Sequence, residues 1–105
     1  MSGQNLGEFE QIVLLAVVRL GEGAYGVPIR GEIEKRGGRT VTIGALYSTL
    51  DRLEAKGCLT SWFADPTGER GGRSRRYFRV EPQGLEALAR AKNVLDRMWK
   101  GVRLA

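Results

Sequence analysis

The side chains with the clearest chemistry in this sequence are arginines on a glycine-rich stretch. Residues 66–80 contain five arginines and one glutamate, which accounts for four of the five excess positive charges of the chain. Guanidinium groups hydrogen-bond phosphate oxygens and enter narrow minor grooves of DNA. A charge run is usually a solvated loop, but this concentration favours a polyanionic partner. The arginines concerned are Arg70, Arg73, Arg75, Arg76 and Arg79.

Catalysis and metal binding find little support in the sequence. It contains no histidine and one cysteine, and its carboxylates are scattered over expected helix surfaces instead of being paired. A nucleophile therefore lacks a base, and a metal ion lacks nitrogen and sulfur ligands. We expect no enzyme, no metal and no cofactor. Cys58 is interpreted as a small buried hydrophobe at the start of a strand, with redox sensing as the alternative.

A second surface of interest lies on residues 42–57, which have the sharpest helical pattern in the chain. One stripe of this helix is apolar and is expected to face the core, namely Ile43, Leu46, Leu50 and Leu53. The opposite face carries Gly44, Ser48, Arg52 and Ala55. Small side chains with one hydroxyl and one guanidinium suit the floor of a DNA major groove, whereas an ordinary solvated amphipathic helix is the alternative. Thr42 is expected to cap this helix and Gly57 to end it.

Residues 8–20 are expected to form the first helix. One face is apolar at helical spacing and should serve the core of its own chain, through Phe9, Ile12, Val13, Ala16, Val17 and Leu20. Leu14, Leu15 and Val18 make the middle of the segment apolar nearly all round, so the other face should meet a partner. A buried strand is the alternative, because several of these residues are β-branched.

The next segments predict a helix-turn-helix. Residues 21–26 match the G-x-G-x-x-G fingerprint of dinucleotide sites, but they follow a helix instead of a strand, so we interpret them as a loop. A short helix should follow, with Pro28 in its first turn, with Val27, Ile29 and Ile33 on its apolar side, and with Gly37 and Gly38 at its end. A short helix, a turn and the helix at 42–57 follow one another as in a helix-turn-helix. In that motif the second helix enters a DNA groove and the first helix supports it.

After residue 57 the pattern changes to strands. Residues 58–64 and 76–80 are rich in β-forming side chains, and the stretch between them contains Pro, Gly and Ser but no apolar residue. This predicts a hairpin with a long loop, and Trp62 is expected to pack on it. Because the hairpin directly follows the helix-turn-helix, its arginines suit phosphates or a minor groove.

A last helix is expected from Pro82 to about Lys100. Its apolar residues stand at near-heptad spacing: Leu85, Leu88, Ala91, Leu95, Met98, Trp99 and Val102. No further element of the chain is left to cover them, and a domain of 105 residues gains stability from an oligomer. We therefore expect a homodimer whose interface contains Leu14, Leu15, Val18, Leu88, Leu95, Met98 and Val102.

Together these elements predict a mainly α-helical fold with a small β-hairpin, a winged helix-turn-helix. Residues 1–81 should form the DNA-binding domain and residues 82–105 the dimerisation helix, within one compact unit. The sequence shows no signal peptide, and its longest apolar run, at 12–18, is too short to span a bilayer. We expect a cytoplasmic protein with no membrane partner.

With these elements in place, the sequence resembles the PadR-type transcriptional regulators, in the short form with a single C-terminal helix. The resemblance is carried by residues 6–34, by GALYSTLDRLEAKG at 44–57 and by GGRSRRYFRV at 71–80. Two departures are visible, since the family often has Pro in place of Ile43 and Thr in place of Glu81. The resemblance implies a homodimeric repressor on an inverted-repeat operator, released in some members by a small phenolic or multidrug-like ligand.

The candidate DNA-binding residues are Thr42, Gly44, Ala45, Tyr47, Ser48, Arg52, Arg70, Arg73, Arg75 and Arg76. Tyr47 either donates its hydroxyl to a phosphate, as the resemblance also suggests, or packs its ring against Tyr25 or the hairpin. Trp99 is an interface anchor or a candidate ligand-binding residue that stacks a planar aromatic effector. The rival function is a winged-helix module that binds protein, which should show large apolar residues on the outward helix face.

Overall fold

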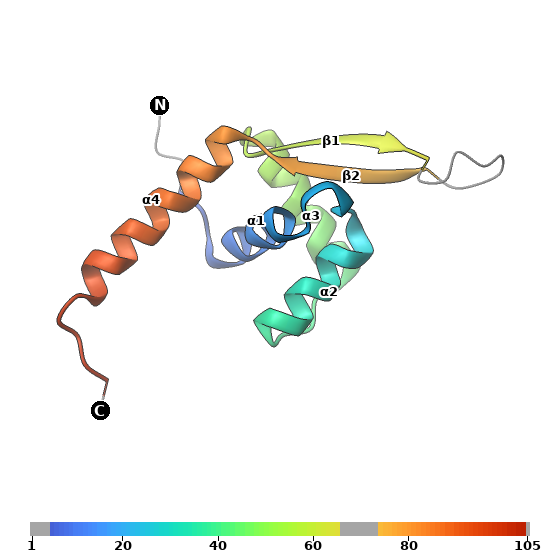
Figure 1. Ribbon diagram of the computed structural model, residues 1–105. Coiled ribbons are helices and arrows are strands. Elements are labelled where there is room, and N and C mark those ends of the chain that lie inside the picture. Colours follow the sequence, from blue (N-terminus) through green and yellow to red (C-terminus); the bar gives the residue numbers. More distant parts are fainter. Residues whose placement is uncertain (1–4, 66–73, 105) are drawn as a thin grey trace.

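The secondary structure follows the predicted order. The computed structural model describes residues 5–65 and 74–104. Its elements are α1 (Glu8–Leu20), a 3₁₀ turn (Gly21–Gly23), α2 (Gly26–Gly37), α3 (Ile43–Ala55), β1 (Leu59–Ala64), β2 (Arg75–Val80) and α4 (Pro82–Trp99). Figure 1 shows α1, α2 and α3 packed together, the β1–β2 hairpin across them and α4 leading away. The winged helix-turn-helix prediction is confirmed.

Helix α1 is central to the core and contacts α2, α3, β2 and α4. Its residues Val13, Leu14 and Val17 recur at the spacing of one helix face and are almost completely buried. The other large side chains with almost no exposed surface are Ile29, Ile33, Leu46, Leu50, Leu53, Leu59 and Phe78. Residues 12–18 therefore belong to a helix with one buried face, and the alternative of a buried strand is wrong.

The division of the α1 faces was predicted incorrectly at one residue. Leu14 was expected at a dimer interface, but it is completely buried inside its own chain. The reason is that elements pack against α1 on several sides, so its buried face includes both Val13 and Leu14. Leu15 and Val18 are exposed as expected, whereas Phe9, Ile12 and Leu20 pack on the margin of the core and are only partly buried.

Two further apolar residues were expected to face the core, but the structure leaves them exposed. Val27 is 70% exposed because it lies two positions before Ile29, which is about 200° away around the helix. Ile43 has the spacing of the buried stripe but is 44% exposed, since it occupies the first position of α3 at the margin of the core. The predicted C-terminal ends of α2 and α3 are confirmed, because Gly38 and Gly57 have positive φ angles, of 66° and 80° respectively.

The hairpin β1–β2, called the wing below, is antiparallel with Leu59 opposite Val80 and Ala64 opposite Arg75. An isolated bridge adds to the hairpin, because Tyr25 pairs with Tyr77 and the Ala24 carbonyl accepts a hydrogen bond from the Phe78 N–H at 2.9 Å. Residues 21–26 are thus a 3₁₀ turn and a strand contact, not a nucleotide loop. Residues 66–73, for which the sequence predicts a long loop, lie outside the described residues.

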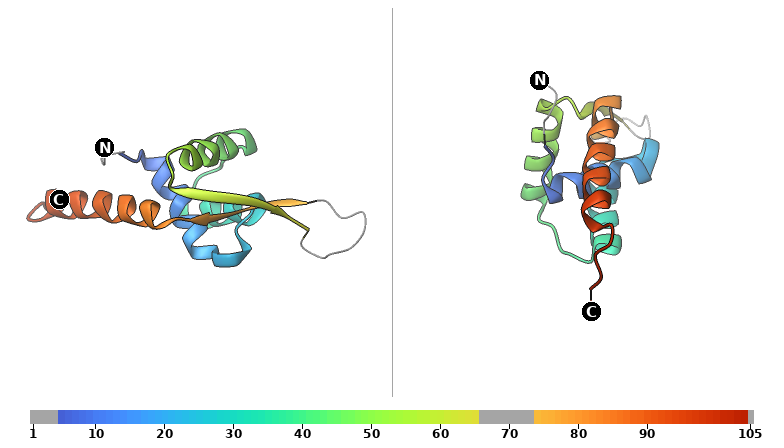
Figure 2. Two further views of the ribbon diagram at one scale, coloured as in Figure 1. Left: turned by 90° about the horizontal axis from the view of Figure 1, so that it is seen from above. Right: turned by 90° about the vertical axis from the view of Figure 1, so that its left-hand side faces the viewer.

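Helix α4 leaves the core soon after it begins. Only Gly84 and Ala87 are buried along it, and the remainder is partly or largely exposed. Figure 2 shows α4 and the wing extending in opposite directions from the helical core, and the longest dimension is 58 Å. No helix in the described part of the chain is long and apolar enough to cross a membrane.

We expect Gly84→Ala to destabilise the fold by about 1–3 kcal/mol, because a rigid neighbour leaves no room for a methyl group. A Cβ at Gly84 would lie 2.5 Å from the Cys58 carbonyl oxygen and 2.9 Å from Cγ1 of Val80. Gly31→Ala is the matched control, since a Cβ there meets nothing within 4 Å, and it should stabilise α2 by about 0.5–1 kcal/mol. Urea unfolding at one protein concentration measures both. Equal stability of the two variants would contradict the close approach of α4 to β1.

Candidate nucleic-acid interface

The outward face of α3 starts with small side chains. The Thr42 hydroxyl accepts a hydrogen bond from the Ala45 N–H at 3.1 Å, which confirms the predicted cap. Gly44, Ala45 and Ser48 are exposed, and a Cβ built at Gly44 would meet no atom within 4 Å. In both views of Figure 2, α3 lies at an outer side of the molecule. A large partner surface can therefore approach the start of α3 closely.

Arg52, expected on the same outward face, is held by an ion pair within the chain. Its Nε lies 3.0 Å from Oε2 of Glu10, and its Nη2 donates to the Thr49 hydroxyl at 3.3 Å. Lys56 Nζ lies 2.9 Å from both carboxylate oxygens of Glu10. One buried carboxylate of α1 thus holds two basic side chains, Arg52 near the end of α3 and Lys56 directly after it.

The electrostatics of Glu10 follow from these contacts. Burial alone would raise its pKa, but hydrogen bonds from Lys56, the Gly7 N–H and Arg52 outweigh that effect, so the pKa of Glu10 is lowered from its usual value. The Gly7 N–H donates to Glu10 Oε1 at 2.8 Å, which also closes the first turn of α1. Glu10 is therefore a charged anchor between the start of α1 and the end of α3.

Arg76, a predicted DNA contact, is engaged in ion pairs within the chain. Its Nη1 lies 2.9 Å from Asp51 and its Nη2 lies 2.8 Å from Glu54, both on α3. Its Nε donates to the Ser61 hydroxyl at 3.1 Å, and Ser61 donates to Glu54 at 2.7 Å. Burial would lower the pKa of Arg76, but the bonds to Asp51 and Glu54 raise it. Arg76 joins the wing to α3.

The neighbouring arginines on the other face of the wing are exposed. Arg75 lies over the ring of Tyr25, with 4.4 Å between the guanidinium carbon and the ring centroid. Arg79 pairs with Glu81 at 3.4 Å and lies 5.8 Å from the centroid of Trp62, which stacks on Tyr77. The predicted packing of Trp62 on the hairpin is confirmed. Arg70 and Arg73 lie outside the described residues.

Tyr47 packs inside the domain. Its ring centroid is 6.3 Å from that of Phe78 on β2, and a Cβ added at Gly26 would collide with its hydroxyl group. Of the two interpretations offered for Tyr47, the contacts fit packing against the hairpin. Tyr47 therefore helps to set the distance between α3 and the start of α2.

The sequence analysis missed four residues that orient α3: Glu10, Asp51, Glu54 and Ser61. A signal for Glu10 was present, because it lies on the same helical stripe as the buried Val13, Leu14 and Val17. A carboxylate at such a position requires cationic partners. No local pattern marks the pairing of Arg76 with α3, since those partners are 22 and 25 residues away.

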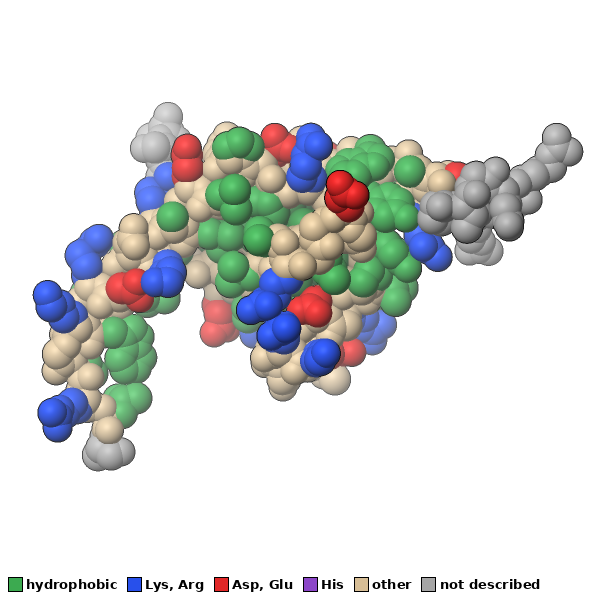
Figure 3. All heavy atoms as spheres, in the orientation of Figure 1, with side chains coloured by type: hydrophobic (Ala, Val, Ile, Leu, Met, Phe, Trp, Pro, Cys, Tyr) green, Lys and Arg blue, Asp and Glu red, His purple; other side chains and the backbone are tan. Residues whose placement is uncertain are grey.

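The residues proposed for an interface with a second copy form a separate surface. Leu95, Met98, Trp99 and Val102 on or just after α4 are each at least half exposed, whereas Leu88 packs on the core and is partly buried. Figure 3 shows hydrophobic side chains between the wing and the start of α4, and again along α4 on the side turned toward the helical core. The unpaired apolar face of α4 is as predicted.

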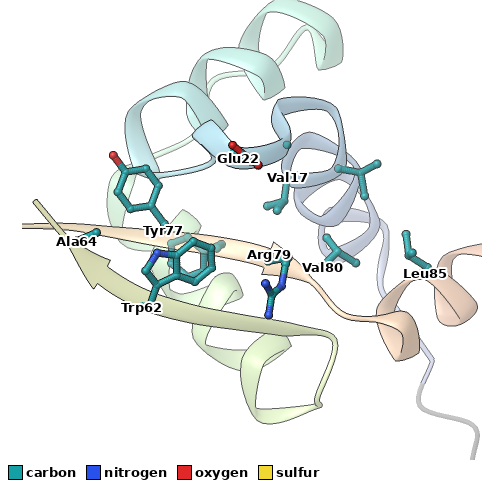
Figure 4. Close-up of a pocket in the computed structure, with 11 residues that line it drawn as sticks. Val17, Glu22, Trp62, Ala64, Tyr77, Arg79, Val80 and Leu85 are labelled. Carbon is teal, nitrogen blue, oxygen red and sulfur yellow. The ribbon is translucent and has the colours of Figure 1, made fainter. Parts of the chain in front are cut away.

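An open groove of about 710 Å³ lies between the wing, the end of α1 and the start of α4. Figure 4 shows Trp62 and Arg79 of the wing on one side, and Val17 and Leu85 on the other. The groove is mainly apolar and continues the exposed surface of α4 at Leu85. It belongs to the same apolar region as the proposed interface.

Cys58 is buried at the foot of β1, in agreement with the prediction of a small buried hydrophobe. Burial raises the pKa of its thiol, so the reactive thiolate form is disfavoured. Within residues 5–65 and 74–104, no group of three His, Cys, Asp or Glu side chains is placed to hold a metal ion.

Comparison with known proteins identifies relatives of this chain. The model of the family described as "Transcriptional regulator PadR-like family" matches residues 14–90. A Mycobacterium tuberculosis protein named transcriptional regulator Rv3488 is 36% identical over 78 residues, which cover 74% of this chain and 68% of that protein.

Solved structures share the fold. A PadR family transcriptional regulator from Eggerthella lenta matches with a TM-score of 0.69 at 26% identity, over 90% of this chain and 81% of that one. A transcriptional regulator from Clostridium thermocellum matches with a TM-score of 0.70 at 24% identity, over 87% and 85%. The family match spans the helix-turn-helix, the wing and the first half of α4. The chain therefore belongs to the PadR-like family of transcriptional regulators, which are not enzymes.

Proposed function

We propose that this protein binds an inverted-repeat operator in double-stranded DNA as a homodimeric repressor. The observation that carries the proposal is the open, small-residue face at the start of α3 beside an arginine-bearing wing. In this arrangement α3 enters the major groove and the wing lies along the neighbouring phosphates or minor groove. Selection of bound sequences from a random duplex pool tests it. Recovery of no preferred sequence would contradict it, and would favour the protein-binding module.

The residues divide into three roles in this proposal. Thr42, Gly44, Ala45 and Ser48 approach the bases, because they are exposed on the first two turns of α3. Arg75 contacts phosphate from the exposed face of the wing, and Arg70 and Arg73, which precede it in the sequence, are proposed for the same role. Arg52, Arg76 and Tyr47 are engaged within the domain, so they position α3 instead of contacting DNA.

The dimer is supported by the apolar surface that one chain leaves open. Leu15 and Val18 on α1 and the stripe of Leu85, Leu95, Met98, Trp99 and Val102 are all close to half exposed or more. Exposed clusters of large apolar side chains are typical of protein interfaces. A second copy would cover it with the same residues by two-fold symmetry.

A small aromatic effector completes the proposal. Trp99 is 52% exposed near the end of α4, where it could stack a planar ligand between two copies. A ligand that binds the DNA-free form better shifts the equilibrium away from the operator complex. This would make the repressor responsive to the ligand concentration.

Replacement of a wing arginine should change the salt dependence of DNA binding. Arg75→Gln removes one phosphate contact per protomer, so the slope of log K against log salt should flatten by up to about 1.8 in a dimer. Arg97→Gln, the same charge change on α4, should leave the slope nearly unchanged. Fluorescence anisotropy with a labelled selected duplex at several salt concentrations gives the slopes.

Ser48→Ala serves as the opposite control, because a hydroxyl that reads base edges contributes little to counterion release. We expect it to change the preferred sequence at the positions facing Ser48 and to keep the salt slope of the wild type. If Arg75→Gln changed the preferred sequence and left the slope of log K against log salt unchanged, the assignment of roles to α3 and the wing would be wrong.

A charge placed on the apolar stripe of α4 should dissociate the dimer. Leu95→Glu changes a side chain that is 51% exposed in one chain, so the protomer should remain folded while burial at the interface becomes unfavourable. Asn93→Glu adds the same charge on the opposite side of α4 and should stay dimeric. Equilibrium sedimentation at micromolar concentration distinguishes the 11.6 kDa chain from its dimer. A monomeric wild type would refute the dimer.

Effector binding should be visible in the fluorescence of Trp99. In the Trp62→Phe chain Trp99 is the only tryptophan, and we expect a planar phenol from a screening panel to quench it and to weaken operator binding over the same concentration range. The Trp99→Phe chain should show neither effect. Quenching without any change in DNA binding would mean that the ligand site is not coupled to the operator.

A further inference from the structure

We propose that the first turn of α3 recognises thymine, through contacts of Ile43 and Ala45 with thymine C5-methyl groups in the major groove. The inference rests on the proposed binding of DNA through α3 and adds which base that helix reads.

The charged side chains of α3 are engaged within the domain. Asp51 and Glu54 pair with Arg76 of the wing at 2.9 and 2.8 Å. Arg52 pairs with Glu10 at 3.0 Å and donates to Thr49. A bidentate contact with guanine needs an arginine fork directed at the base, and Arg52 is directed at α1. The helix therefore has no basic side chain free of such pairing to read guanine.

The amide side chains that read adenine are also missing. The sequence of α3, IGALYSTLDRLEA, contains neither asparagine nor glutamine. The Thr42 hydroxyl is used as the helix cap, and the Tyr47 ring packs on Phe78. Ser48 is therefore the exposed side chain in the first two turns of α3 that can still hydrogen-bond a base. Direct readout by this helix must therefore depend largely on apolar contacts.

The exposed residues at the start of α3 supply such contacts. Ile43 is 44% exposed, and Gly44 and Ala45 are exposed beside it. Successive residues of a helix are rotated by about 100°, so the side chains of Ile43 and Ala45 project on either side of Gly44. Nothing lies within 4 Å of a Cβ at Gly44, so the backbone can come close to the base edges there.

Thymine is the base that matches this surface. Its C5-methyl group is the apolar group that unmodified DNA presents in the major groove, and aliphatic side chains pack against it. Ile43 keeps 44% of its surface exposed in the free protein, although an isoleucine is a large apolar group to leave partly in water. Contact with a thymine methyl would remove that surface from water when the operator binds.

Deoxyuridine tests the inference, because it pairs as thymine does and lacks only the methyl group. A duplex selected by the wild type from a random pool is remade with deoxyuridine at each thymine of the preferred positions, one at a time. We expect binding to weaken about fourfold for each contacted thymine that is replaced, because burial of one methyl group contributes a factor of about that size. Replacement in both half-sites should weaken binding about fifteenfold. Deoxyuridine outside the preferred positions should have no effect.

Two variants assign the effect to Ile43. Ile43→Ala should bind the thymine and deoxyuridine duplexes with nearly equal affinity at the position that Ile43 contacts, whereas Ile43→Val should keep most of the difference. Both substitutions shorten a side chain that is partly exposed at the margin of the core, and thermal unfolding at one protein concentration verifies that the variants fold as the wild type does.

The outcomes separate this inference from the proposed function. Sequence-specific binding that is insensitive to deoxyuridine at every thymine would overturn thymine recognition and leave DNA binding intact. Full discrimination by Ile43→Ala would overturn the assignment to Ile43. A wild-type protein that selects no sequence would overturn the proposed function, and this inference with it.

Discussion

The carboxylate of Glu10 is the constraint on which the position of α3 depends. It stands on the buried stripe of α1, so it must be paired, and the cations within reach are Arg52 and Lys56 at the far end of α3. Its lowered pKa means that this pairing stabilises the fold at neutral pH and is lost as the pH falls through the folded-state pKa. The end of α3 is thereby fixed against α1, while its start remains open.

Ion pairs also fix the wing against α3. The Arg76 guanidinium donates hydrogen bonds to Asp51 and Glu54 of α3 and to the Ser61 hydroxyl of β1. The wing and α3 are therefore joined as one unit. Adjacent residues of a strand point to opposite faces, which leaves Arg75 exposed while Arg76 is turned inward. The C-terminal half of α3 is thus held by ion pairs to α1 and to the wing, and in the proposed function the wing carries the positive charge that meets phosphates.

Local patterns in the sequence predicted the elements well and their surroundings less well. The Thr42 cap, the glycine stops and the strand segments are local features, and each is observed. Leu14 was assigned to the wrong surface because the middle of α1 is apolar nearly all round, so periodicity cannot tell one buried face from another. The partners of Arg76 and Arg52 lie 22 to 42 residues away, and no helical or strand period encodes such pairs.

The connection between α4 and α3 follows from contacts at one corner of the fold. The Gln83 side chain donates to the carbonyl of Lys56 at the end of α3, and the Glu81 N–H donates to the carbonyl of Cys58 at the foot of the wing. Gly84 lies so close to Cys58 that no side chain fits between them. The first turn of α4 is therefore packed rigidly against the end of α3 and the start of β1. Because packed interiors deform little, a change in the angle of α4 must move both of these elements together.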